Sequence, residues 1–194
     1  MPRTLHLIKH GRPAILPGVP AHEWALAPGA LDGLDALAAR LRPRPHLVVS
    51  SEEPKARATA AALAGALDVR HRPMLGLHEQ LRYTAPFHAD PADFQADLRR
   101  FFAQPGQVVS GEESADDARR RFATALHAAL RANPQEVVAV VTHGTVMSLL
   151  AAQLAGLDPE PLWRRLRFLD VLTLEVTEGR PGEPLRLSWR EPTV

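Results

Sequence analysis

Two apolar segments of this chain end in the same dipeptide, His-Gly. Residues 5–11 read LHLIKHG, and residues 138–144 read VAVVTHG. Short, continuous apolar runs are typical of strands that are buried on both faces, as in parallel sheets. Glycine after each histidine permits a tight turn and a close approach of the backbone to a ligand. We therefore expect two buried strands, each ending in a histidine at the edge of a sheet.

The rest of the chain alternates between strand-like and helix-like patterns. We expect strands at residues 5–9, 46–50, from 69 onward, 137–142, 169–176 and 185–189, and helices at 30–41, 55–67, 91–102, 114–131 and 145–154. Ser114 is the expected N-cap of its helix and Gly156 the expected terminator of the last one. Residues 11–29 and 80–91 read as loops. This alternation predicts an α/β fold, a three-layer α/β/α sandwich with a mostly parallel sheet.

Length and composition limit the possible functions. A chain of 194 residues predicts one domain, residues 1–194. The net charge of +1 gives no general reason to expect nucleic acid. The absence of cysteine excludes disulfides and thiolate metal sites. No apolar run approaches the ~20 residues that span a bilayer, and residues 1–4 lead directly into a strand, so we expect a cytoplasmic protein without a signal peptide or membrane contact.

Cationic and imidazole groups gather where three strands are predicted to end. Lys9 and His10 end the first strand, His143 ends the fourth, and Lys55 opens the helix after Ser50 and Ser51. In open α/β sheets, ligands bind beyond the carboxyl ends of the strands, where helix N-termini offer N–H groups. If the three strands are parallel neighbours, these groups meet in one crevice that suits a compact dianion such as phosphate. One histidine alone would more often be structural.

These residues resemble the motifs of the histidine phosphatase superfamily, in particular its phosphoglycerate mutase-like branch. That branch carries Arg-His-Gly, Ser-Ser-Pro-Leu-x-Arg-Ala-x-x-Thr-Ala, Leu-x-Glu, a Gly-Glu-Ser-type segment and a second His-Gly. The corresponding segments here are residues 9–11 (KHG), 50–60 (SSEEPKARATA), 77–79 (LHE), 111–114 (GEES) and 143–144 (HG). The second His-Gly favours this branch, since the acid-phosphatase-like branch usually has His-Asp there. The resemblance implies a phosphoglycerate mutase-like fold.

The chain departs from the family at the phosphate-binding positions. Both arginines of the family motifs are lysines here, Lys9 and Lys55, and only two of the 23 basic residues are lysines. A lysine provides a point charge, whereas an arginine provides a planar fork that fits an oxyanion. Arg12 is either a substitute phosphate ligand or a loop residue that meets solvent. Arg57 lies on the same helix as Lys55 but is turned about 200° away.

The resemblance implies a route through a phosphohistidine. His10 would attack phosphorus, with its other ring nitrogen oriented by a backbone carbonyl, and Glu79 would protonate the leaving oxygen. Lys9, Lys55, His143 and Arg12 would bind the phosphoryl oxygens. No cofactor or metal is expected, because these cations supply the charge. An alternative interpretation takes His10, Glu79 and His143 as metal ligands.

The resulting hypothesis is a phosphatase that hydrolyses a small phosphomonoester. One alternative is a catalytically weak or inactive protein that binds phosphorylated ligands, and another is a phosphoglycerate-type mutase, for which the chain looks too short. The expected partners are a small phosphorylated substrate or inorganic phosphate. Tyr83 and Phe87 are candidate contacts for the leaving group. We interpret residues 119–121 (RRR) as a solvated face with one inward side chain and residues 163–167 as a surface turn or a subunit contact. Neither substrate nor oligomeric state follows from the sequence.

Overall fold

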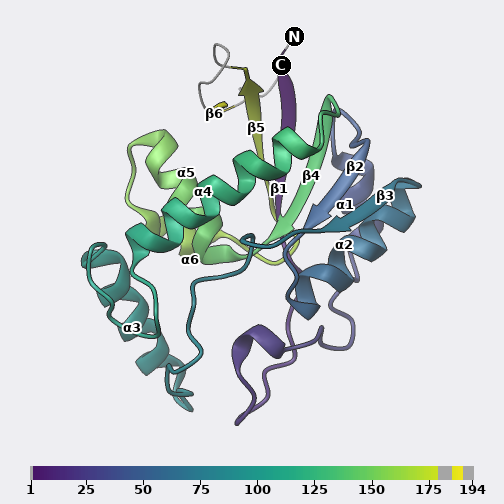
Figure 1. Ribbon diagram of the computed structural model, residues 1–194. Coiled ribbons are helices and arrows are strands. Elements are labelled where there is room, and N and C mark those ends of the chain that lie inside the picture. The colour runs from purple at the N-terminus through teal and green to yellow at the C-terminus, as the bar shows by residue number, and fades with distance from the viewer. Residues whose placement is uncertain (1, 179–184, 190–194) are drawn as a thin grey trace.

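A six-stranded sheet forms the centre of the computed structural model, which describes residues 2–178 and 185–189. Its order is β3-β2-β4-β1-β5-β6 (Figure 1). The strands are β1 (Arg3–Lys9), β2 (Leu47–Ser50), β3 (Arg70–Pro73), β4 (Val137–Thr142), β5 (Val171–Thr177) and β6 (Arg186–Trp189). β1 to β4 are parallel neighbours, whereas β5 is antiparallel to both β1 and β6. The predicted α/β fold with a mostly parallel sheet is confirmed.

Helices cover both faces of this sheet. They are α1 (Leu34–Arg40), α2 (Pro54–Leu67), α3 (Pro91–Ala103), α4 (Ala115–Ala132), α5 (Gly144–Ala155) and α6 (Pro159–Arg165), with a short 3-10 helix, η1 (Ala21–Glu23). Leu5 and Leu7 of β1 face a core shared with α3, α4 and α5, while Ile8 faces a second core shared with α1 and α2. This alternation is the period-2 pattern of a strand that is buried on both sides.

The three central strands end together. Lys9 of β1 is in register with Thr142 of β4, and Ser50 of β2 with Val141. Backbone hydrogen bonds continue one residue further, from His10 N to the Thr142 carbonyl and from Ser51 N to the Val141 carbonyl, each 3.0 Å long. β1, β4 and β2 are therefore parallel neighbours, as the predicted crevice at their carboxyl ends requires.

The chain after α5 forms a helix, α6, whose last residues overlap the segment 163–167, which was expected to be a surface turn or a subunit contact. Asp158 caps α6 by accepting from the Glu160 N–H at 3.0 Å, and Pro159 occupies the first turn, where a missing N–H costs nothing. Trp163 packs against the larger core. The segment was missed because a helix of seven residues is too short to show a clear apolar period.

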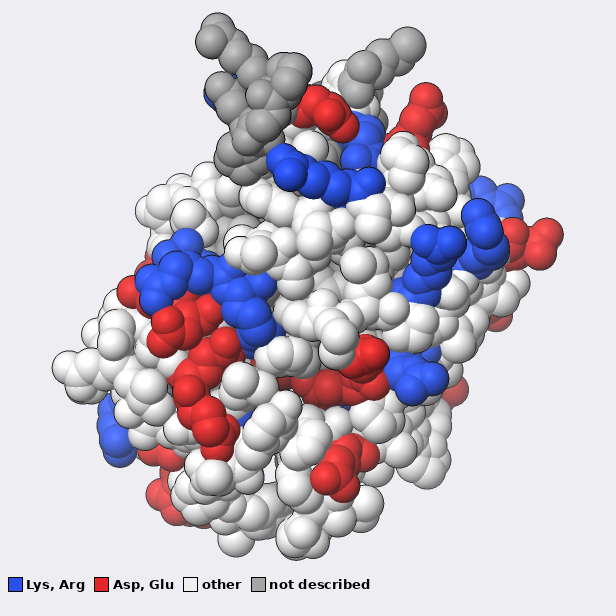
Figure 2. Space-filling model, viewed as in Figure 1, with Lys and Arg blue, Asp and Glu red and all other residues white. Residues whose placement is uncertain are grey.

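Charged side chains are mixed on the surface. On the face of the described residues shown in Figure 2, Lys and Arg are interspersed with Asp and Glu rather than gathered into one basic patch. Attraction of an anion must therefore come from local groups. In the part of the chain that the structure describes, none of the helices has the length and apolar character needed to cross a bilayer.

Candidate active site

His10 and His143 meet edge to face just beyond the ends of β1 and β4. Their ring centroids lie 5.1 Å apart, and the side chains are 6% and 0% exposed. Both also line a cavity of about 540 Å³. The convergence of the two His-Gly segments follows directly from the parallel pairing of β1 and β4.

His10 has a fixed tautomer. Its Nδ1–H donates to the carbonyl oxygen of Gly11 at 2.7 Å, so Nε2 carries the free lone pair. Burial lowers the pKa of His10 well below its usual value, and the neighbouring His143, Lys55 and Lys9 lower it further. Gly11 itself has no room for a side chain, since a Cβ there would lie 2.8 Å from the Ala30 carbonyl oxygen. His10 is therefore a neutral imidazole at neutral pH, with an oriented ring and an unprotonated Nε2.

His143 has one nitrogen paired and one without a partner. Its Nε2 lies 2.9 Å from Ser51 Oγ and 3.5 Å from a carboxylate oxygen of Glu53. Its Nδ1 is buried and has no hydrogen-bond partner among the described residues. Burial, followed by the charge of Lys55, lowers its pKa well below the usual value. A buried imidazole nitrogen without a partner in the wall of a cavity is a position for a ligand atom.

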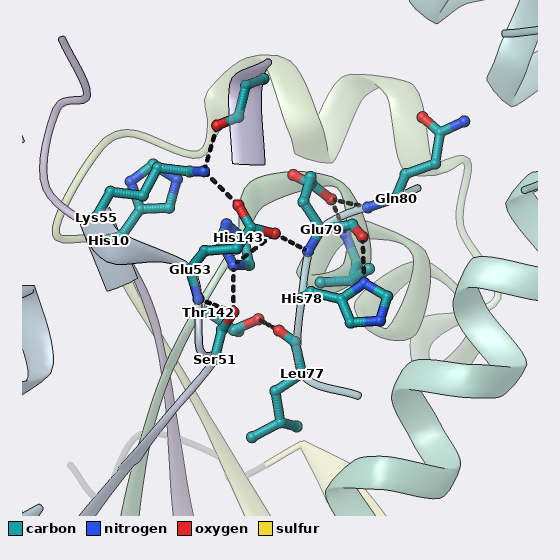
Figure 3. Close-up of polar contacts among 12 residues, drawn as sticks. His10, Ser51, Glu53, Lys55, Leu77, His78, Glu79, Gln80, Thr142 and His143 are labelled. Atoms are coloured by element: carbon teal, nitrogen blue, oxygen red, sulfur yellow. Dashed lines mark hydrogen bonds and ion pairs between the residues drawn. The ribbon is translucent and has the colours of Figure 1, made fainter. Parts of the chain in front are cut away.

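Lys55 is paired with Glu53, a residue that the sequence analysis did not single out. Its Nζ donates to Glu53 Oε2 and, at 2.8 Å, to the carbonyl oxygen of Ala21 (Figure 3). The other oxygen of Glu53 accepts from the Glu79 backbone N–H at 2.9 Å. The sequence contained one sign of this residue: Glu53 stands at the position where the family motif has leucine. A buried carboxylate thus links a predicted phosphate ligand to the predicted general acid.

Lys9 is held by the segment that follows α6. Its Nζ donates to the Leu166 carbonyl oxygen at 2.9 Å and lies 4.8 Å from the centroid of the Phe168 ring. Burial lowers its pKa, while the charges of Glu79 and Asp170 act in the opposite direction. The ammonium therefore sits in the cavity wall between a carbonyl group and an aromatic face.

The carboxylate of Glu79 lies at the start of α5. Its oxygens accept from the backbone N–H groups of Thr145 at 3.0 Å, Val146 at 3.3 Å and Gln80 at 2.9 Å. A helix N-terminus favours an anion, because its first N–H groups have no partner within the helix. These N–H groups were expected to face a ligand, but in the structure they bind the Glu79 side chain.

Arg121 holds the backbone around Glu79 from behind. Its guanidinium donates to the carbonyl oxygens of Gly76, His78 and Glu79 at 2.9–3.0 Å and forms an ion pair with Glu113. The other two arginines of residues 119–121 pair with side chains on the surface. The sequence predicted that one of these arginines points inward. It could not predict that Arg121 positions Glu79, because the contacts join segments far apart in the chain.

The cavity contains all but one of the predicted site residues. Lys9, His10, Lys55, Glu79 and His143 line it, as do the predicted leaving-group contacts Tyr83 and Phe87. Arg12 does not line the cavity; it is exposed, and its guanidinium donates to the Pro28 carbonyl oxygen at 3.0 Å. Among the described residues, no three His, Cys, Asp or Glu side chains are grouped so as to hold a metal ion.

The sequence places this site within a known family. Residues 6–191 match the sequence model of the histidine phosphatase superfamily, branch 1. The chain belongs to this superfamily. Comparison with curated protein sequences gives no match. The family resemblance drawn from the His-Gly motifs is thereby confirmed, and the matched region includes every residue of the site described above.

Solved structures of this superfamily have the same fold. A mycobacterial glucosyl-3-phosphoglycerate phosphatase superposes with a TM-score of 0.74 at 21% identity, covering 97% of each chain. A mutant phosphoserine phosphatase from Entamoeba histolytica, in complex with phosphoserine, gives 0.67 at 17% identity, covering 95% of this chain and 94% of the other. The mycobacterial enzyme with inorganic phosphate gives 0.68 at 22% identity, covering 97% and 96%. At these identities the likeness establishes the shared fold.

Proposed function

We propose that this protein is a phosphatase that hydrolyses a small phosphomonoester through a phosphohistidine intermediate on His10. The observation that carries the proposal is the bond from His10 Nδ1–H to the Gly11 carbonyl, which leaves Nε2 unprotonated in the cavity. Phosphatases are also the proteins named among its structural neighbours. Lys9 and Lys55 supply positive charge beside this nucleophile, so the reaction needs no added metal.

The reaction has two steps. In the first, the lone pair of His10 Nε2 forms the N–P bond while the bond from phosphorus to the leaving oxygen breaks, and the acid form of Glu79 protonates that oxygen. In the second, the Glu79 carboxylate takes a proton from water, whose oxygen attacks phosphorus and breaks the N–P bond. The second step returns His10 and Glu79 to their starting forms and releases inorganic phosphate.

His143 and the two lysines stabilise the phosphoryl oxygens. The free Nδ1 of His143 donates to one of them if its Nε2 accepts from the Ser51 hydroxyl, an arrangement that the 2.9 Å contact permits. Lys9 and Lys55, which both line the cavity, oppose the negative charge. Such preorganised charge is most of what phosphoryl-transfer catalysis requires. Arg12 has no part in this arrangement, since it lies outside the cavity wall.

Replacement of His10 tests the nucleophile. With p-nitrophenyl phosphate and chelator present, we expect the wild type to release nitrophenol and His10→Ala to lose about 10³-fold or more in kcat/KM. The control is His46→Ala, an exposed histidine that does not line the cavity. Wild type denatured at alkaline pH, where the acid-labile N–P bond survives, should carry one phosphoryl group on a tryptic peptide containing His10. Activity of His10→Ala equal to that of the wild type would refute the mechanism.

Replacement of Glu79 tests the general acid. Glu79→Gln should lower kcat by about 10²–10⁴-fold on an alkyl phosphate, whose alkoxide needs a proton to leave. The loss on p-nitrophenyl phosphate should be much smaller in the phosphorylation step, because nitrophenolate leaves without one. Equal losses on the two substrates in a single-turnover burst would show that Glu79 is not the proton donor.

A second candidate function is binding of phosphorylated ligands without turnover. The observation that favours it is the Glu53–Lys55 pair, in which a carboxylate already neutralises one of the two ammonium groups proposed to bind phosphate. This function predicts that inorganic phosphate raises the melting temperature while no phosphate ester is hydrolysed. A Lys9→Ala, Lys55→Ala double variant should then lose the stabilisation.

A further inference from the structure

The cavity extends well beyond the histidines, and its outer wall is aromatic. Six of the ten aromatic residues in the chain line it. They are Trp24, Tyr83, Phe87, Phe94, Trp163 and Phe168. They come from four separate parts of the chain: the loop before α1, the loop after Glu79, α3, and the α6 region. Aromatic residues from distant segments are thus concentrated around one opening.

We propose that the substrate is a phosphate monoester of a bulky, apolar alcohol, either an aryl alcohol or an alkyl chain of several carbons. This inference rests on the proposed phosphatase function. The phosphoryl group lies between His10, His143 and the lysines, and the organic group lies against the aromatic wall. Figure 2 shows mostly uncharged side chains on the corresponding part of the surface, between α3 and η1.

Exposure of the wall supports this assignment. Ile15, Tyr83, Phe87 and Phe168 all line the cavity although they are 61%, 53%, 46% and 42% exposed. Exposed apolar side chains that surround one cavity gain free energy when an apolar group covers them, in proportion to the area removed from water. A small polar alcohol such as glycerate or serine would cover little of this area.

The charged side chains of the cavity wall also favour an apolar organic group on the substrate. Arg82 is the only arginine in the described cavity wall, and its guanidinium lies over the Phe94 ring, 5.0 Å from the centroid, where Asp97 and Glu79 compensate its charge. His88 is already bonded to Asp97 at 2.8 Å. The outer wall therefore provides no uncompensated cation for a carboxylate or a second phosphate on the substrate.

The size of the cavity fits an extended organic group. At about 540 Å³ it lies within the range of about 300–1,000 Å³ typical of pockets for drug-sized ligands. Phosphate needs only the part next to His10 and His143. The remaining space suits an alcohol of about six to ten carbon atoms.

A series of alkyl phosphates tests the inference. Methyl, butyl, hexyl and octyl phosphate have leaving groups of nearly equal acidity, so differences in kcat/KM report contact with the cavity wall. We expect kcat/KM to rise by about 2- to 4-fold per methylene, the range expected for partial to full burial of a CH₂ group. Phosphoserine and 3-phosphoglycerate should be poorer substrates than hexyl phosphate by about 10-fold or more.

Variants of the wall identify which surface is responsible. Tyr83→Ser and Phe87→Ser should flatten the series, with the largest loss for octyl phosphate and little change for methyl phosphate. Both side chains are exposed, so the substitutions should leave the fold intact. Leu157→Ser, at an equally exposed apolar residue outside the cavity, is the matched control and should retain the full slope.

Binding measurements separate this inference from the proposed function. Calorimetry with His10→Ala gives the dissociation constants of the same alkyl phosphates. We expect them to fall as the alkyl chain lengthens, even if no variant shows turnover. If the protein hydrolyses the series but neither kcat/KM nor Kd depends on alkyl chain length, the proposed substrate class is wrong and the phosphatase function stands. If no compound is hydrolysed but Kd falls steeply with alkyl chain length, the phosphatase function is wrong and the apolar ligand class stands.

Discussion

Glu53 contributes a negative charge to the proposed phosphate site. Two lysines and two glutamates line the cavity wall close to the histidines: Lys9, Lys55, Glu53 and Glu79. Because burial lowers the pKa values of His10 and His143 well below their usual range, both imidazoles are neutral at pH 7. While Glu79 is ionised, these four side chains have a net charge near zero, and a phosphate dianion that enters the cavity meets the Glu53 carboxylate next to Lys55.

Removal of that carboxylate should tighten phosphate binding. Glu53→Gln keeps an oxygen that can accept from the Glu79 N–H but removes one negative charge, worth on the order of 2 kcal/mol at several Å in a partly buried site. We expect the dissociation constant of inorganic phosphate, measured by calorimetry, to fall about 10-fold or more. Slower release of phosphate should lower kcat wherever release limits the rate.

The neighbouring Glu52 provides a matched control for this experiment. It lies in the same loop with the same charge, but it is exposed and does not line the cavity. Glu52→Gln should change phosphate affinity by less than about 2-fold, since exposed charges are screened by solvent and salt. Equal effects of the two variants would mean that net charge alone, rather than the Glu53–Lys55 contact, controls binding.

At the scale of helices and strands, α4 supports the loop that carries Glu79. Arg121 of α4 joins Glu113 to the carbonyl groups of Gly76, His78 and Glu79. The Glu113 side chain is 7% exposed, so the loss of its partner leaves a nearly buried charge. The position of Glu79 therefore depends on a helix whose apolar face packs in the core.

Replacement of Arg121 should affect both stability and catalysis. Arg121→Gln should lower the free energy of unfolding by about 3 kcal/mol, as expected when one member of a largely buried pair is removed. It should also lower kcat more than it raises KM, because it displaces Glu79 rather than the phosphate site. Arg120→Gln, which breaks an exposed pair with Asp117 on the same helix, should cost about 0–1 kcal/mol and leave kcat unchanged. Similar kcat values for both variants would contradict the positioning role.

The boundaries of these elements show what local sequence could predict. β4 was predicted to the residue, because a continuous apolar run has one stable placement in the centre of a sheet. Ser114 was correctly predicted to cap α4 and Gly156 to end α5; the structure shows that Gly156 adopts a left-handed conformation. The helix expected from residue 30 begins at Leu34 instead, since Gly33, with φ of 149°, ends a turn there.

The same distinction applies to the site. His10 and His143 could be predicted because each ends a strand, and parallel strands bring their ends together. The Glu53–Lys55–Glu79 link could not, because it requires the loop after β3 to lie against the start of α2, which only the tertiary structure determines. Arg121 was missed as a support for Glu79 for the same reason.

At the scale of the whole molecule, the site makes folding depend on pH. His10 and His143 have lowered pKa values in the folded protein, mainly because of burial, whereas in the unfolded chain they titrate near 6.5. Below that pH the unfolded state binds more protons than the folded state, so stability falls as pH falls. Above about pH 7 both states hold neutral imidazoles, and these two residues add no pH dependence.

We therefore expect the free energy of unfolding to be nearly constant from pH 8 to pH 7 and to fall by about 2–3 kcal/mol or more between pH 7.5 and pH 5.5, with His10 and His143 each contributing up to about 1.4 kcal/mol per pH unit. His71 and His127, whose pKa values are also lowered mainly by burial, add to this loss. Urea unfolding in phosphate-free buffers measures this, since bound phosphate would itself stabilise the fold. His143→Gln cannot take up a proton and should reduce the loss by about 1.4 kcal/mol, whereas His22→Gln, at a more exposed histidine, should leave it unchanged. A loss that is the same in His143→Gln as in the wild type would place the proton uptake elsewhere, and equal stability at the two pH values would show that the buried imidazoles can become charged without cost.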